Sequence, residues 1–253
     1  MCIFSMGIGQ VTGTQIFASA AWKSQILVYS MQIMTQHDVA MILPLPIPPG
    51  SPGEEVRFIN LQDYPEFFQH LALAFWEPSH DGGNSILMSL QGRGPLPVHH
   101  VGLFEASFVP SLDEFRWLDP RFRLPSQVWD QLPQYADWGF AVFKLKPGAR
   151  PQNIHPMALE FPRRDPHQLF FPTVHVHDGQ IHTRAEFDHT LYAQVDRPPV
   201  RHRAEPVWSQ SQSSLREYID FARAAGIVTP DCPLYRRQIM GMQPNQDTIL
   251  QLL

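Results

Sequence analysis

The stretch TQIFASAAWKSQILVYSMQIM, residues 14–34, decides the fold of this chain. Its two halves, 14–21 and 25–34, are rich in apolar and β-branched residues and are separated by a short polar break. This pattern is typical of two successive strands. A similar run at 38–46 follows, so the three segments predict an antiparallel meander. The prolines from Pro44 onward end the last strand, because proline cannot donate an N–H to a sheet ladder.

The remainder of the chain adds strands and a few helices. Strand-like patterns recur at 139–146, 155–161, 169–177 and 180–187. Helical spacing of apolar residues and candidate N-caps predict helices over 63–75 and 214–225. Strands and helices do not alternate regularly, which disfavours a doubly wound nucleotide fold. The sequence therefore predicts a single α+β domain, residues 1–253, with largely antiparallel sheets and a few flanking helices.

The composition disfavours several classes of protein. The chain of 253 residues has 24 acidic side chains against 19 lysines and arginines, so a nucleic-acid partner is not expected. No apolar run approaches the roughly 20 residues that a membrane span needs. Two cysteines without a secretion signal are expected to stay reduced, which favours the cytoplasm. The motifs of serine-elbow hydrolases, zincins and P-loop enzymes do not occur.

Cys2 is a candidate nucleophile. If Met1 is removed, this residue carries both a thiol and a free α-amine, and the pKa of such an amine, roughly 7.7–8.0, lets it act as a base. A Met-Cys start followed by a short strand, a glycine-bearing turn and the strand at 14–21 resembles the N-terminal nucleophile hydrolases. This resemblance implies a four-layer αββα sandwich and a hydrolase of amide, ester or similar bonds.

The resemblance has one departure, on the strand at 14–21. Members of the cysteine branch commonly place an arginine or acidic residue there, and this strand has no charge. We therefore expect Gln15, Ser19 or a distant residue to orient Cys2. An asparagine is expected to stabilise the oxyanion, and three are candidates: Asn60, Asn84 and Asn153. In the alternative reading, Cys2 is a small buried residue at the start of an edge strand.

A second resemblance concerns DVAMILPLPIPPGSP, which begins at Asp38. With the early cysteine and the preceding strands, this stretch makes residues 1–50 similar to an uncharacterised bacterial protein family. That family has no function to transfer, so the resemblance only supports treating these residues as a unit.

A histidine-rich stretch, FFPTVHVHDGQIHTRAEFDH at 170–189, is a second candidate site. Its Asp-Gly pair predicts a type I′ hairpin in which His175 faces His182 across the ladder. Side chains two apart share a face, so His177 projects with them. Three imidazoles converging from two strands can hold zinc and leave a fourth position for water, as in carbonic anhydrase-like sites. The alternative is a solvated hairpin face without a metal.

Three further residues of this stretch are also candidates. Arg184 shares the predicted histidine face and would suit an anionic substrate there. Asp188 and His189 lie beyond the predicted register and are candidates to join either site from a neighbouring strand.

The leading hypothesis from the sequence is a hydrolase in which Cys2 attacks a carbonyl, assisted by His175 or His182. Its expected partner is a small-molecule substrate, with neither nucleic acid nor membrane, and it needs no cofactor. One alternative is a zinc-dependent hydrolase on His175, His177 and His182. The other alternative, from a different class, is a non-catalytic protein whose β-rich domain binds a ligand.

Overall fold

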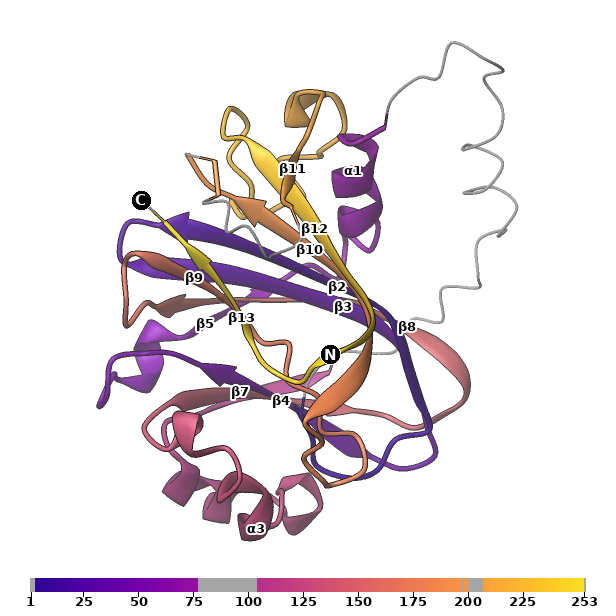
Figure 1. The fold of residues 1–253 in the computed structure, drawn as a ribbon, viewed down its shortest axis with the longest axis vertical. Helices are drawn as coiled ribbons and strands as arrows, with labels where there is room; N and C mark the ends of the chain where they lie inside the picture. Colours follow the sequence, from indigo (N-terminus) through magenta and orange to yellow (C-terminus); the bar gives the residue numbers. More distant parts are fainter. Residues whose placement is uncertain (1–2, 77–103, 197, 200–206, 253) are drawn as a thin grey trace.

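A computed structural model describes residues 3–76, 104–196, 198–199 and 207–252 (Figure 1). Cys2 and Asn84 lie outside this range. The described part is built mainly from two sheets and short helical segments, so the expectation of largely antiparallel sheets with few helices is confirmed. The only parallel ladder among the described strands joins residues 190–194 to residues 15–19.

The first sheet has four strands in the order β1 (Ile3–Phe4), β4 (Val39–Leu45), β7 (Gly139–Leu145) and β6 (Glu105–Val109). The second has seven, in the order β11 (Ser209–Gln210), β12 (Leu234–Pro244), β10 (Arg184–Gln194), β2 (Gln10–Ala21), β3 (Ser24–Thr35), β8 (Gly148–Pro162) and β5 (Arg57–Asn60). A two-stranded sheet pairs β13 (Thr248–Gln251) with β9 (Gln168–Phe171).

The helical segments are short. The α-helices are α1 (Phe67–Leu73) and α3 (Ser126–Trp129), and the 3₁₀ turns are η1 (Gly53–Glu55), η2 (Leu112–Trp117), η3 (Pro120–Phe122), η4 (Pro133–Tyr135) and η5 (Leu215–Glu217). No helix in the described ranges is long and apolar enough to cross a membrane.

The predicted meander is only half right. β2 and β3 form the expected antiparallel hairpin, with Phe17 opposite Val28. β4 instead enters the other sheet, between β1 and β7. Every residue of β4 is buried, because Met41 packs into the core between the two sheets while Ile42 packs on the other face. A strand covered on both faces shows a continuous apolar run, and such a run does not reveal which neighbour the strand pairs with.

Three hydrophobic clusters hold the elements together. The largest joins alternate residues of both sheets, such as Leu27 and Phe143. A second packs Val28 and other residues on the opposite face of the seven-stranded sheet against Phe67 of α1. A third packs the outer face of the four-stranded sheet against α3, whose Trp129 lies 5.1 Å from the ring of Phe140. Figure 1 shows α1 and α3 beside different sheets.

The helix expected over 214–225 is absent. Only η5 forms there, followed by turns, although Ser214 does accept a hydrogen bond from the Arg216 N–H. The carboxylate of Asp220 accepts from the N–H groups of Ala222 and Arg223. This local bonding is an alternative to helical hydrogen bonds, and the segment follows it.

Candidate functional site

The histidine-bearing segment, residues 172–177, lies against the first strand of the chain. The N–H of Phe4 donates to the carbonyl of Val176 at 3.0 Å, and the N–H of Ile8 donates to the carbonyl of His177 at 3.1 Å. Ile3 forms a parallel bridge with Val176. β1 is therefore held on both sides, by this segment and by β4.

Asn245 clamps the same segment from the turn between β12 and β13. Its Oδ1 accepts from the N–H of His175 at 2.7 Å, and its Nδ2 donates to the carbonyls of His175 and His182, each at 2.9 Å. One amide side chain thus satisfies three backbone groups from both sides of the Asp178-Gly179 turn.

Asp247, in the same turn, is a half-buried residue with a desolvated carboxylate. It accepts from the N–H groups of Thr173 at 2.8 Å and Val174 at 3.1 Å, and from the hydroxyl of Tyr135 at 2.5 Å. Burial raises the pKa of Asp247 to about 6, although the three donors oppose that rise. The carboxylate therefore joins η4, the histidine segment and the chain leading into β13.

Three imidazoles form the centre of this region, which we call the histidine cluster: His175, His177 and His189. The ring of His175 lies 5.1 Å from each of the other two, and Phe187 lies 4.2 Å from it. Phe4 closes the side at His177, with ring centroids 5.6 Å apart. The cluster is an aromatic stack that combines histidine and phenylalanine rings.

Burial sets the charge of this cluster. It lowers the pKa of His175 to about 2 and that of His177 to about 4, and it lowers the pKa of His189 well below its usual value. All three rings are therefore neutral near pH 7. The Nε2 atoms of His175 and His177 are buried without a hydrogen-bond partner. The cluster is packed like a core and has no charged member.

The predicted histidine hairpin is wrong. Gly179 does take the left-handed conformation of a turn, with φ of 76°, but the chain after it pairs with β12 and β2 and does not return along 174–177. His182 is exposed and bonds to Asp178 at 2.9 Å. The zinc tripod of His175, His177 and His182 therefore does not form, and the described part of the chain holds no group of three or more His, Cys, Asp or Glu side chains that suits a metal ion.

Part of the histidine prediction is confirmed. His175 and His177 do share a face, and Val174 and Val176 point away from it into the cluster that covers the four-stranded sheet. His189, which the sequence left as a candidate, joins them from β10.

The other sequence candidates lie apart from the histidine cluster. Ser19 of β2 bonds to the carbonyl of Ile227 at 3.4 Å. Ser19 and Gln15 share the face of β2 that carries Phe17, which packs with α1, whereas His189 shares its face with Leu191, in the core between the sheets. The histidine cluster and these two polar residues thus occupy opposite faces of one sheet.

The two described asparagines are also remote from the cluster. Asn60 is exposed on β5 and accepts from the N–H of Gln62, and Asn153 is exposed on β8 opposite Gln32. Arg184 is exposed at the start of β10 and donates to the carbonyl of Met242 at 2.6 Å. The predicted catalytic set is therefore not assembled in the part of the chain that the structure describes.

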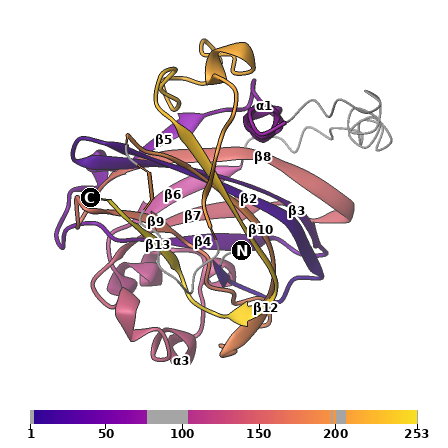
Figure 2. The same cartoon turned by 45° about the horizontal axis from the view of Figure 1, so that its top comes forward.

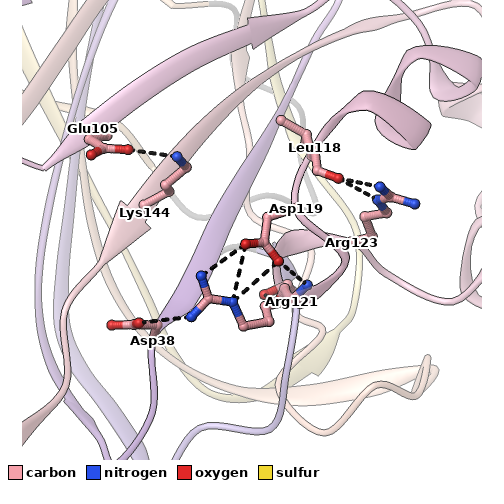
Figure 3. Close-up of polar contacts among 8 residues, drawn as sticks. Asp38, Glu105, Leu118, Asp119, Arg121, Arg123 and Lys144 are labelled. Carbon is pink, nitrogen blue, oxygen red and sulfur yellow. Dashed lines mark hydrogen bonds and ion pairs between the residues drawn. The ribbon is translucent and has the colours of Figure 1, made fainter.

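A charged cluster lies around η3 (Figure 3). The guanidinium of Arg121 pairs with Asp119 at 2.9 Å and with Asp38 at 3.4 Å, and its hydrogen bonds lower the pKa of Asp119 to about 2. The backbone carbonyl of Arg121 accepts from the hydroxyl of Ser5 at 3.1 Å. These exposed ion pairs contribute little energy. Their effect is to orient η3 beside the first residues of the chain.

Nothing in the sequence pattern points to Asn245, Asp247 or Arg121 as site residues. The run PNQDT, which contains the first two, has the polar residues of a turn. That local signal predicts a turn. It does not predict that the turn will contact a segment about 70 positions earlier in the sequence.

Comparison with known proteins identifies a structural relative. No family model and no curated protein matches the sequence. The crystal structure of baculovirus P35 matches with a TM-score of 0.52 and 13% identity, covering 100% of this chain and 99% of the P35 chain. The chain shares the fold of P35. Weaker matches are a mutated baculovirus P35 after caspase cleavage (TM-score 0.48, 13% identity, 96% of this chain and 100% of that one) and P35 in a complex with caspase-8 (0.42, 12%, 95% and 96%).

This finding corrects three expectations from the sequence. The resemblance to N-terminal nucleophile hydrolases is wrong, because the fold is that of P35. The reading as a cysteine-dependent hydrolase with Cys2 as nucleophile is overturned on the same ground. The expected small-molecule substrate is overturned with it, because that expectation followed from the hydrolase reading.

Proposed function

We propose that this chain is a non-catalytic protein that binds a caspase-type protease. The observation that carries the proposal is the end-to-end likeness to P35, which leaves almost no part of either chain unmatched. A mutated P35 has been observed after caspase cleavage, and P35 has been observed in a complex with caspase-8. A shared fold of this extent supports a shared way of binding, and the third hypothesis from the sequence, a non-catalytic binding protein, agrees with it.

The proposal makes the chain a target of the protease it binds. Caspases cut after aspartate, and the sequence between α1 and β6 contains Asp81 followed by Gly82 and Gly83. Glycine after the aspartate leaves the bond without a bulky neighbour. The bond between Asp81 and Gly82 is therefore the first one that we expect a caspase to cut. It is preferred to the other Asp-Gly bond, Asp178-Gly179, because the Asp178 carboxylate already bonds Gln180 and His182.

The test is cleavage of the full chain by active caspase-8, followed by mass spectrometry of the intact products. The expected result is a single cut, after Asp81. The Asp81→Ala variant should stay whole, whereas the control Asp130→Ala, at an exposed aspartate that follows α3, should be cut like the wild type. A chain that caspase-8 leaves whole, or cuts only elsewhere, would contradict the proposal.

Three finer expectations belong to the proposal. We infer a four-layer αββα arrangement, which is supported by the separate hydrophobic clusters on the outer face of each sheet. We infer a cytoplasmic protein, in line with a chain of only two cysteines. We also infer that binding needs no cofactor, because a protein partner can be held by surface contacts alone.

A further inference from the structure

The turn between β2 and β3 carries the most exposed large apolar side chain in the described part of the chain. Trp22 is 88% exposed, and Lys23 beside it is also exposed. Figure 2 shows this turn at the left-hand edge, beside the connection from β8 to β9, as Figure 1 does. At that exposure, no other element covers the indole ring.

Turn geometry does not explain this tryptophan. Two-residue hairpin turns favour asparagine, aspartate and glycine, because their central residues commonly take a positive φ. Trp22 and Lys23 form such a turn between the paired Ala21 and Ser24, and neither takes a positive φ. Neither the turn nor the core needs this large aromatic side chain. It therefore indicates a contact outside the chain, since tryptophan is enriched where an apolar phase meets water.

Arg163 holds the turn in place. Its N–H donates to the carbonyl of Lys23 at 2.9 Å, and its Nη2 donates to the carbonyl of Trp22 at 2.8 Å. Its Nη1 donates to the carbonyl of Pro166 at 2.8 Å, so one arginine joins the turn to the connection between β8 and β9. A turn fixed in this way presents Trp22 outward before any partner arrives, which lowers the entropic cost of binding.

The charge around the indole is positive. Lys23 has no hydrogen bond or ion pair in the structure, and the side chain of Arg163 bonds only carbonyl oxygens. Asp165 is the acid that acts on Arg163, and its carboxylate also accepts from the N–H of His167 at 2.8 Å. Two cations against one acid leave the turn positive. The other described charges beside it are paired: Arg57 with Glu160, and Arg164 with Asp137.

A lipid surface fits this combination better than a protein surface does. A protein interface needs several apolar side chains at its centre and roughly 800 Å² on each partner. Trp22 is the one exposed large apolar residue among β2, β3 and residues 162–168, all of which the structure describes. A tryptophan at a turn can enter the headgroup layer alone, and each lysine or arginine beside it adds attraction to anionic lipid.

We propose that the β2–β3 turn binds the surface of an anionic membrane, with the indole of Trp22 in the headgroup layer and the ammonium of Lys23 at the lipid phosphates. Binding through one tryptophan and two cations is weak and reversible, at about millimolar lipid. The expectation from the sequence that no membrane is bound is revised, because a long apolar run is needed to span a bilayer and not to touch it. The proposal does not depend on caspase binding, and its test uses no protease.

The test is sedimentation of the full chain with lipid vesicles, at lipid concentrations up to about 5 mM. Phosphatidylcholine vesicles with about 30% phosphatidylserine should carry the protein down, and pure phosphatidylcholine should bind it about fivefold more weakly. Salt at about 0.5 M should remove that difference, because it screens the charges. Brominated lipid should quench the tryptophan fluorescence of the bound protein, since the indole of Trp22 lies against the lipid.

Matched variants place the contact on the turn. Trp22→Asn introduces a residue that turns favour, so it should fold normally, weaken binding by about tenfold or more and abolish the quenching. Trp117→Asn, at another tryptophan that is 75% exposed, should bind like the wild type. Lys23→Gln should weaken binding to the anionic vesicles about fivefold, whereas Lys146→Gln, at another exposed lysine, should not.

Three results would overturn the proposal. The first is no sedimentation with about 5 mM anionic lipid. The second is equal binding by Trp22→Asn and the wild type. The third is a doubled mass of the wild type in light scattering without vesicles, which Trp22→Asn reduces to that of a single chain, because Trp22 would then contact a second copy of this chain.

Discussion

At the scale of single residues, the sequence predicts orientation better than partners. Alternation along 174–177 correctly places His175 and His177 on one face, because side chains two apart in an extended segment always share a face. Alternation does not show that this face is turned into the core, nor that Asn245 and Asp247 will bond the segment. Those contacts join residues about 70 positions apart, and no local signal specifies them.

The histidine cluster makes the protein sensitive to acid. Burial depresses the pKa of all three histidines, so below about pH 6.5 the unfolded chain binds more protons than the native one. The free energy of unfolding should therefore fall as the pH is lowered, by up to about 1.4 kcal/mol per pH unit for each buried histidine. Urea unfolding at a series of pH values between about 7 and 4.5 measures this slope.

Two variants assign the slope to the cluster. His177→Phe keeps an aromatic ring beside Phe4. It should reduce the slope of unfolding free energy against pH by the contribution of one titrating histidine. His37→Gln, at an exposed position, should leave it unchanged. Equal slopes for His177→Phe and the wild type would show that the ring is protonated in the folded state, contrary to this account.

Asp247 is expected to have the opposite pH dependence. Its pKa is raised to about 6, so its stabilising contribution is complete below about pH 3.8 and is lost as the pH rises through 6. Asp247→Ala should lower the free energy of unfolding by about 3–5 kcal/mol, because it leaves buried donors without an acceptor. Asp247→Asn should cost less and should remove this pH dependence. Thermal and urea unfolding of both variants measure these changes in stability. An Asp247→Ala variant as stable as the wild type would contradict the proposed role of Asp247 in holding the histidine segment.

At the scale of elements, local patterns predict the strands well and their pairing poorly. β2, β3 and β7 lie close to where the sequence places them, and the β2–β3 hairpin follows from a short connection. The Asp178-Gly179 turn forms, but its flanks pair with β1, β12 and β2, which are distant in sequence. β12 was missed because its exposed half carries polar and methionine side chains without an alternating pattern.

β1 should contribute far more to stability than its two residues suggest. Phe4 is fully buried, packs in the core between the sheets and contacts the ring of His177. Phe4→Ala should therefore lower the free energy of unfolding by about 3–5 kcal/mol. Met6→Ala, two residues further on and exposed, should change it by less than about 0.5 kcal/mol. Urea unfolding of the two variants makes the comparison, and similar small effects would mean that β1 is not docked as described.

At the scale of the whole molecule, the sequence predicts the class of fold and not its identity. Sheet-rich architecture with few helices follows from the strand patterns. The parallel pairing of β10 with β2 joins segments about 175 residues apart. β4 follows β3 in sequence but lies in the four-stranded sheet, whereas β2 and β3 lie in the seven-stranded sheet. Local sequence patterns leave these long-range pairings open. The early cysteine, with the short strand and glycine-bearing turn that follow it, therefore led to the wrong family.

The most direct test of the central claim, that this fold binds a caspase-type protease, is complex formation in solution. Full-length protein mixed with active caspase-8 would be separated by size-exclusion chromatography with light-scattering detection. The account predicts a stable complex whose mass is the sum of both partners, and its loss in Asp81→Ala but not in Asp130→Ala. Separate elution of the two proteins, with caspase-8 fully active afterwards, would contradict it.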